Sequence, residues 1–202
     1  MLWMFSATLR HLIMSEQIQR LSAKEMPEDL ASFLRPRVER LGYLGEFFQC
    51  TAHQPEALLS FLEFTEHLKH ALPSNLTEVV ALSVAVLMDN AYERVQHERL
   101  SLKLGLGEDW LHEVLDLSAT DATVLSVEER IVQKFAVAVV KRVGRDTTAE
   151  LEEVVRLLGT PQAIAVLMLI GRYMSHAIMV NTLKLAPPAL PSSKAPQAHT
   201  EY

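Results

Sequence analysis

The sequence predicts an all-α protein, with a single domain of about seven or eight helices. Only 7 glycines occur in 202 residues, and long stretches are rich in Leu, Ala, Val, Glu and Arg. Apolar residues recur at helical spacing, and no segment shows the two-residue alternation of a strand or an Asn-Gly hairpin turn. Hydrophobic residues make up 49% and charged residues 22% of the chain, a globular balance that excludes intrinsic disorder.

The first predicted helices lie between residues 27 and 71, where apolar side chains recur every three or four positions. Pro36 and the pair Gly42 and Gly45 are expected to kink or divide the first of them, because both residue types disturb a helix interior. Pro55 suits the first position of the next helix, where a backbone N–H has no partner to lose.

The centre of the chain predicts two consecutive helices joined by a tight break. Residues 76–88 follow Pro73 and are nearly all apolar, which is typical of a helix buried on all sides. Residues 89–90, Asp-Asn, interrupt this apolar run. A second helix is then expected over residues 91–104, with Gly105 as its stop.

The second half of the chain predicts further helices with clear start signals. Residues 116–126 are polar and small, which is typical of a loop. Ser126 with Glu129, and Thr147 with Glu150, have the spacing of capping boxes. The predicted helices of this half span residues 108–115, 126–144, 147–159 and 160–185.

Composition divides the chain into three parts. Residues 1–26 form an N-terminal extension, or the chain starts at Met14, since no small-residue cleavage site closes the apolar beginning. The helical domain is expected over residues 27–185. Residues 186–202 hold 4 of the 9 prolines without apolar periodicity, which predicts a mobile tail.

Charge and cysteine content exclude several classes of function. A net charge of −6 without any basic run gives no electrostatic footprint for nucleic acid. A single cysteine, Cys50, excludes an internal disulfide, a Cys-x-x-Cys pair and a thiolate-rich zinc site. No stretch is expected to reach the ~18 apolar residues of a membrane span, because Gly171 and Arg172 follow the closest candidate, residues 163–170. We therefore expect a cytoplasmic protein without a membrane partner.

The best candidate for chemistry lies across the two central helices. Glu93 and His97 are four residues apart, so their side chains share one helix face. If the chain turns at residues 89–90, Glu78 on the preceding helix approaches the same place. A carboxylate beside an imidazole fixes its tautomer and raises its basicity, which suits a general acid or base acting on a small organic substrate.

A purely structural interpretation of these residues is also open. Asn75 with Glu78, and Asn90 with Glu93, both have the spacing of a capping box, with Asn in place of Ser or Thr. Either glutamate could then satisfy a backbone donor, and His97 could be an ordinary surface or core histidine.

Residues 76–105, LTEVVALSVAVLMDNAYERVQHERLSLKLG, resemble the core of the carboxymuconolactone decarboxylase and alkylhydroperoxidase D superfamily. The peroxidase branch of that superfamily places Glu, Cys, Cys and His at offsets of 0, 12, 15 and 19. Counting from Glu78 gives Asn90, Glu93 and His97, so the glutamate and the histidine match and both cysteines are missing. The resemblance implies an AhpD-like helical bundle.

The missing cysteines decide which chemistry the resemblance implies. Reduction of a hydroperoxide needs thiolates, and Cys50 lies upstream of the motif with no resolving partner, so a thiol peroxidase is not expected. The resemblance to the cysteine-free branch implies decarboxylation or isomerisation of a small unsaturated carboxylate or lactone, without a cofactor. It assigns His97 as proton donor or acceptor, Glu93 as its orienting partner and Glu78 as a second acid/base group. The candidate substrate-binding residues are Asn90, Arg94, Arg99, Arg172 and His176.

The sequence is also compatible with two other functions. The first is an oligomeric peroxidase-family protein without thiol redox activity, which binds a small molecule or a partner and in which Glu78 and His97 point apart. The second is a metal enzyme, since two carboxylates and an imidazole can hold iron, manganese or zinc. The Glu-x-x-His motif of di-metal bundles is absent, however, so no metal is expected.

The protein is expected to form a homo-oligomer. The helices over residues 76–88 and 162–185 carry more apolar surface than one small domain covers comfortably. The family resemblance implies dimers, trimers or trimers of dimers, and we expect a trimer or a hexamer.

Overall fold

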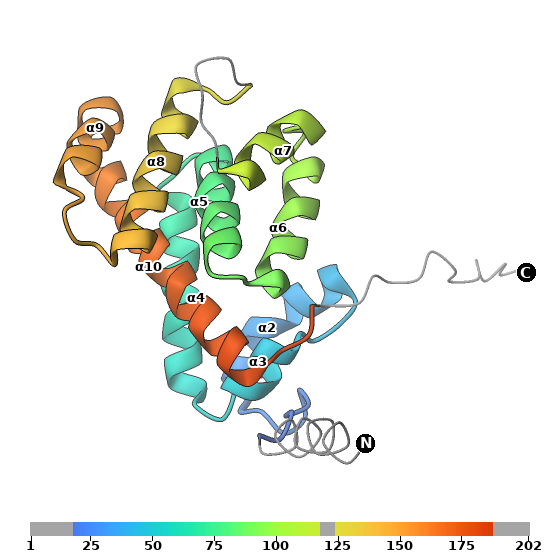
Figure 1. Cartoon of the computed structure of the whole chain (residues 1–202). Helices are drawn as coiled ribbons and strands as arrows, with labels where there is room; N and C mark the ends of the chain where they lie inside the picture. The colour runs from blue at the N-terminus through green and yellow to red at the C-terminus, as the bar shows by residue number, and fades with distance from the viewer. Residues whose placement is uncertain (1–17, 118–123, 188–202) are drawn as a thin grey trace, which may run out of the picture.

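The computed structural model describes residues 18–117 and 124–187, and all regular structure within these ranges is helical (Figure 1). The helices are α2 (Glu28–Leu41), α3 (Glu46–Thr51), α4 (Pro55–His70), α5 (Ser74–Leu87), α6 (Ala91–Lys103), α7 (Glu108–Asp116), α8 (Val127–Arg142), α9 (Thr148–Leu158) and α10 (Thr160–Leu183). The prediction of an all-α fold is therefore confirmed. Most of the predicted N-terminal extension and tail, and the middle of the predicted loop 116–126, lie outside the described residues.

Pro36 does not divide the first helix, whereas Gly42 and Gly45 separate α2 from α3 as predicted. α2 continues through Pro36 to Leu41, because the N–H that proline lacks would have bonded to Ser32, and both residues are exposed to water. Gly42 ends α2 in the left-handed conformation, with φ of 78°, where glycine has no steric penalty. The short α3 begins after Gly45.

α5 is the central helix of the bundle. It packs against α6, α7, α8 and α10, and Figure 1 shows it enclosed by these helices. Ten of its 14 residues, 76–85, are buried, which confirms the prediction of a helix covered on all sides. Its apolar surface is therefore covered within the chain, and it does not support the expected oligomer. On α10, in contrast, Ile164, Met168 and Ile178 are exposed, and the oligomeric state stays a prediction.

Two apolar clusters make the core, and α10 takes part in both. The larger cluster joins α5, α8 and α10 and includes Phe135 and Tyr173. The smaller joins α2, α3 and α4 to the end of α10 and includes Phe47, Tyr92 and Val180. The buried polar residues described below lie where the two clusters meet.

α10 is long and apolar enough, by length and composition alone, to cross a membrane. The prediction that no stretch reaches this length was wrong, because Gly171 and Arg172 lie inside the helix without interrupting it. More than half of its most apolar stretch is buried against the rest of the chain. Arg172 and His176 are buried with it, so in this fold α10 is a core helix.

The capping box at the start of α8 provides a test of local stability. The Ser126 Oγ accepts the Glu129 N–H at 3.2 Å, and Glu129 Oε2 accepts the Ser126 N–H at 2.7 Å. Ser126→Ala should lower the free energy of unfolding by about 1 kcal/mol in urea denaturation. The capping box predicted at Thr147 does not form, because its hydroxyl donates to the carbonyl of Gly144 at 3.3 Å and accepts no backbone N–H of α9. Thr147→Ala is therefore the matched control. Equal losses in the two variants would contradict this account.

Candidate active site

Glu78 on α5 and His97 on α6 are in direct contact. Glu78 is only 2% exposed, and its Oε2 lies 2.7 Å from Nδ1 of His97, with the Ser101 hydroxyl at 3.5 Å. α5 begins at Ser74, so Asn75 is not its cap and instead donates to Glu129 at 2.8 Å. The capping interpretation of Glu78 is therefore wrong, and its carboxylate is available to His97.

Glu93, in the first turn of α6, receives donors on both of its oxygens. Oε2 lies 3.4 Å from Nε2 of His97, while Oε1 lies 3.0 Å from Nη1 of Arg172 and 3.3 Å from Nε2 of His176. Asn90 caps α6 by accepting the Glu93 N–H at 3.1 Å. Only this half of the expected capping box forms at Asn90, because the Glu93 side chain turns into the bundle.

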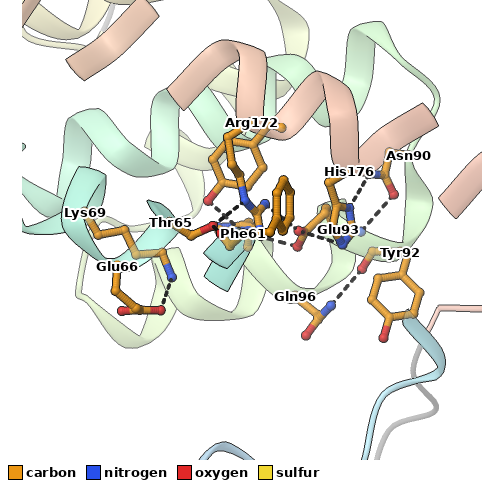
Figure 2. A network of polar contacts seen from close by, with 12 residues as sticks. Phe61, Thr65, Glu66, Lys69, Asn90, Tyr92, Glu93, Gln96, Arg172 and His176 are labelled. Atoms are coloured by element: carbon orange, nitrogen blue, oxygen red, sulfur yellow. Dashed lines mark hydrogen bonds and ion pairs between the residues drawn. The ribbon is translucent and has the colours of Figure 1, made fainter. Parts of the chain in front are cut away.

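α10 supplies the remaining contacts of the cluster from one helix face. Arg172 Nε donates to the hydroxyl of Thr65 on α4 at 2.9 Å, and its guanidinium lies over the rings of Phe61 and Tyr173, at 5.0 and 4.5 Å from their centroids. Figure 2 shows Asn90, His176, Glu93, Arg172 and Thr65 as one connected series. The Tyr173 hydroxyl lies 3.3 Å from Nε2 of His97.

Burial and neighbouring charges together determine which form each ionisable group takes. Burial lowers the pKa of His97, but Glu78 and Glu93 outweigh it and raise this pKa from 6.5 to about 9. Burial also opposes ionisation of Glu93, yet His176, His97 and Arg172 hold the pKa of its carboxyl well below its ordinary value. At His176 burial dominates and lowers the pKa to about 4. Near neutral pH the site therefore holds a charged His97, a charged Glu93 and a neutral His176.

A cavity of about 410 Å³ opens onto this cluster. Its walls include Glu93, His97, Arg172, Tyr173 and His176, together with Phe47 from α3. A cavity of this volume is suitable for a small organic ligand. Glu78 and Asn90 do not line it, so Glu78 contacts His97 from the side away from the cavity.

The cavity wall also carries cations from three helices. They are Arg37 and Arg40 of α2, Lys69 of α4, and Arg99 and Lys103 of α6. Only Arg99 among them was predicted from the sequence, because no spacing rule relates α2 or α4 to the motif on α5 and α6.

Arg94 is not brought to the site. Its side chain is 48% exposed, forms an ion pair with Glu98 at 3.3 Å, and does not line the cavity. It points to solvent although its neighbour Glu93 points inward, because adjacent helix positions face about 100° apart. The expected substrate-binding role of Arg94 therefore has no support in the structure.

Cys50 lies outside the cavity, on α3. It is 5% exposed and packs in the smaller apolar cluster, where burial raises the pKa of its thiol. A buried thiol with a raised pKa is a poor nucleophile. Within residues 18–117 and 124–187, no group of three or more His, Cys, Asp or Glu side chains is arranged to hold a metal ion.

Comparison with known proteins gives matches at two levels. Residues 55–131, from α4 to the start of α8, match the carboxymuconolactone decarboxylase family. An alkylhydroperoxidase AhpD core protein, an uncharacterized peroxidase-related protein from Ralstonia eutropha JMP134, superposes with a TM-score of 0.72 at 17% identity, over 86% of this chain and 94% of that one. No curated protein matches this chain significantly.

Two further solved structures share the fold. A variant of the debrominase Bmp8 in complex with 2,3,4-tribromopyrrole gives a TM-score of 0.73 at 14% identity, over 86% of this chain and 92% of that one. A peroxidase-related protein from Silicibacter sp. TM1040 gives 0.69 at 16% identity, over 86% and 94%. At these identities the structures establish the fold alone.

The two buried histidines should make the free energy of unfolding depend on pH in opposite directions on either side of pH 6.5. The folded-state pKa of His97 is raised to about 9, so its contribution is complete below pH 6.5 and is lost as the pH rises toward 9. The folded-state pKa of His176 is lowered to about 4, so its contribution is complete above pH 6.5 and is lost as the pH falls toward 4. Each histidine contributes up to about 3 kcal/mol to the free energy of unfolding.

Urea denaturation of wild type, His97→Gln and His176→Gln across this pH range measures both contributions. The His97 variant should lose the alkaline decline in stability and keep the acid one, and the His176 variant should do the reverse. An alkaline decline of full size in His97→Gln would show that His97 is not the group responsible.

Proposed function

We propose that this chain is a proton-transfer enzyme, which decarboxylates or isomerises a small unsaturated carboxylate or lactone, because residues 55–131 match the carboxymuconolactone decarboxylase family and the fold is AhpD-like. The observation that supports this most directly is the position of His97, between two carboxylates and at the wall of a cavity. Asn90 and Glu93 stand where the peroxidase branch has cysteines. The site therefore has a proton donor and lacks a thiol.

His97 is the proton donor in this proposal, and Nε2 is the nitrogen that releases the proton. Nδ1 donates to Glu78 over a short 2.7 Å contact, whereas the neighbours of Nε2, Glu93 and Tyr173, lie at 3.4 and 3.3 Å and line the cavity. A pKa of about 9 keeps the ring charged at neutral pH, so it begins as an acid. After transfer, the neutral ring keeps its proton on Nδ1, which still donates to Glu78.

The proton reaches the substrate at a carbon. In decarboxylation, the electron pair of the broken C–CO2 bond remains on the substrate as an enolate or conjugated carbanion. His97 adds a proton to that carbon, and solvent restores the proton on Nε2. In isomerisation, the neutral ring takes back a proton from a second carbon, so His97 serves as acid and then as base.

In this proposal the two glutamates do not take the roles expected from the sequence. Glu78 lies off the cavity and contacts Nδ1, which suits the partner that orients His97. Glu93 lines the cavity, but its depressed pKa makes it a weak base. Its contribution is a fixed negative charge that keeps the proton on His97 until a substrate is bound.

The cations of the cavity wall support an anionic substrate. Arg172 is engaged by Glu93 and Thr65, and Arg37 and Lys69 share Glu66, at 2.9 and 3.6 Å. The remaining cations of the wall, which form no ion pair within the described part of the chain, are Arg40, Arg99 and Lys103. We place the substrate carboxylate among these three side chains.

Turnover of small unsaturated carboxylates and lactones tests the proposal. Wild type should release CO2 or shift a double bond with incorporation of a solvent deuteron, detected by proton NMR in heavy water. His97→Gln keeps a hydrogen bond to Glu78 but cannot transfer a proton, so kcat should fall by about 100-fold or more at unchanged helix content. Cys50→Ser is the control and should leave the rate intact. The opposite pattern in these two variants would rule out proton transfer by His97.

The position of the substrate carboxylate can be tested separately from the chemistry. Arg99→Gln and Arg40→Gln should each raise KM by roughly tenfold with little change in kcat, because each removes a charge that binds ground state and transition state alike. Arg94→Gln, on the solvent side of α6, is the matched control and should leave KM unchanged. If KM rises as much in Arg94→Gln as in Arg99→Gln, the effect comes from the net charge of the protein and not from a binding site.

A further inference from the structure

The side-chain amide of Asn90 makes two hydrogen bonds that fix its orientation. Its oxygen accepts the backbone N–H of Glu93 at 3.1 Å and so caps α6. Its nitrogen lies 3.3 Å from Nδ1 of His176. An amide nitrogen only donates, so the ring nitrogen that it faces must accept and cannot carry a proton. The side chain that caps α6 therefore also determines that Nδ1 of His176, 86 positions away in the chain, carries no proton.

We infer that Asn90 holds His176 as a neutral ring with its proton on Nε2, and that this ring positions the carboxylate of Glu93 beside His97. Asn90 and His176 are then positioning residues, and not the substrate-binding residues that the sequence predicted. The consequence for turnover rests on the proposed function, whereas the protonation of His176 does not.

The contacts of Glu93 support this assignment. Oε1 accepts from Nε2 of His176 at 3.3 Å and from Arg172 at 3.0 Å, which leaves Oε2 to face His97 at 3.4 Å. The His176 ring is 2% exposed and packs on Phe47, with ring centroids 4.2 Å apart, so it has little freedom to rotate. Figure 2 shows Asn90 and Glu93 both joined to this ring.

The balance of buried charge explains why a neutral His176 matters. The charged groups that meet at Glu93 are His97 on α6 and Arg172 on α10, with Glu78 on α5 behind His97. With His176 neutral, two carboxylates face two cations. A charged His176 would be a third buried cation, and it would make the proton of His97 easier to lose. A neutral His176 donates a hydrogen bond to Glu93 and keeps it oriented. The negative charge of Glu93 then still stabilises the protonated form of His97.

Asn90→Asp separates the two functions of this side chain. Aspartate caps a helix about as well as asparagine, so α6 and the fold should persist. A carboxylate only accepts, however, so Nδ1 of His176 must become protonated to bond with it. The pKa of His176 should therefore rise by about two units.

Nitrogen-15 NMR of the full-length protein with labelled histidine measures this directly. In wild type, His176 should be the neutral Nε2–H tautomer at neutral pH, and His176→Gln identifies its resonance. In Asn90→Asp, the same ring should titrate near or above its ordinary pKa. Ser126→Asp is the matched control, since it makes the same kind of cap substitution on α8, and it should leave His176 unchanged.

A second pair of variants tests the positioning of Glu93. The amide of His176→Gln can both accept from Asn90 and donate to Glu93, so His97 should still titrate near pH 9. His176→Leu removes the donor that holds Glu93 beside His97, so the Glu93 carboxylate should move away from Nε2 and the pKa of His97 should fall.

The inference is overturned if wild-type His176 carries a proton on Nδ1 at neutral pH. It is equally overturned if Asn90→Asp leaves the titration of His176 where it was. A failure of every acid and lactone to turn over, with these titrations as expected, would count against the proposed function alone.

Discussion

Two carboxylates can stay charged inside an apolar bundle only when cations lie within hydrogen-bonding distance of them. Glu78 comes from α5 and Glu93 from α6, and their partners His97 and Arg172 come from α6 and α10. Desolvation costs several kcal/mol per buried ion, and a misplaced partner would leave that cost uncompensated. The relative positions of α5, α6 and α10 are therefore tightly constrained, and the two apolar clusters pack around that arrangement.

Features set by short stretches of sequence were predictable. Pro73, the cap at Asn90 and Gly105 mark the ends of α5 and α6 through local backbone chemistry, and all three lie where the sequence placed them. The contact between Glu78 and His97 followed from two helices joined by a short turn. Two antiparallel helices joined by a short loop bring one face of each into contact.

Features that depend on distant segments were not predictable in this way. Arg37 and Arg40 reach the cavity from α2, and nothing near them in the sequence relates them to the motif. Glu93 lines the cavity and Glu78 does not, and the packing of the helices determines which of the two the cavity reaches. For a related reason, Pro36 does not end α2. The carbonyl that loses its hydrogen bond belongs to Ser32, which is exposed to water.

The position of α10 at the C-terminal end of the domain bears on how the site is assembled. On the ribosome, α5 and α6 emerge first, so Glu78, Glu93 and His97 exist before Arg172 has been synthesised. Without α10, Glu93 has neither Arg172 nor His176 beside it. Packing of α10 contributes to both apolar clusters and brings Arg172 to the second carboxylate. The same helix therefore completes the core and supplies the cation that Glu93 contacts.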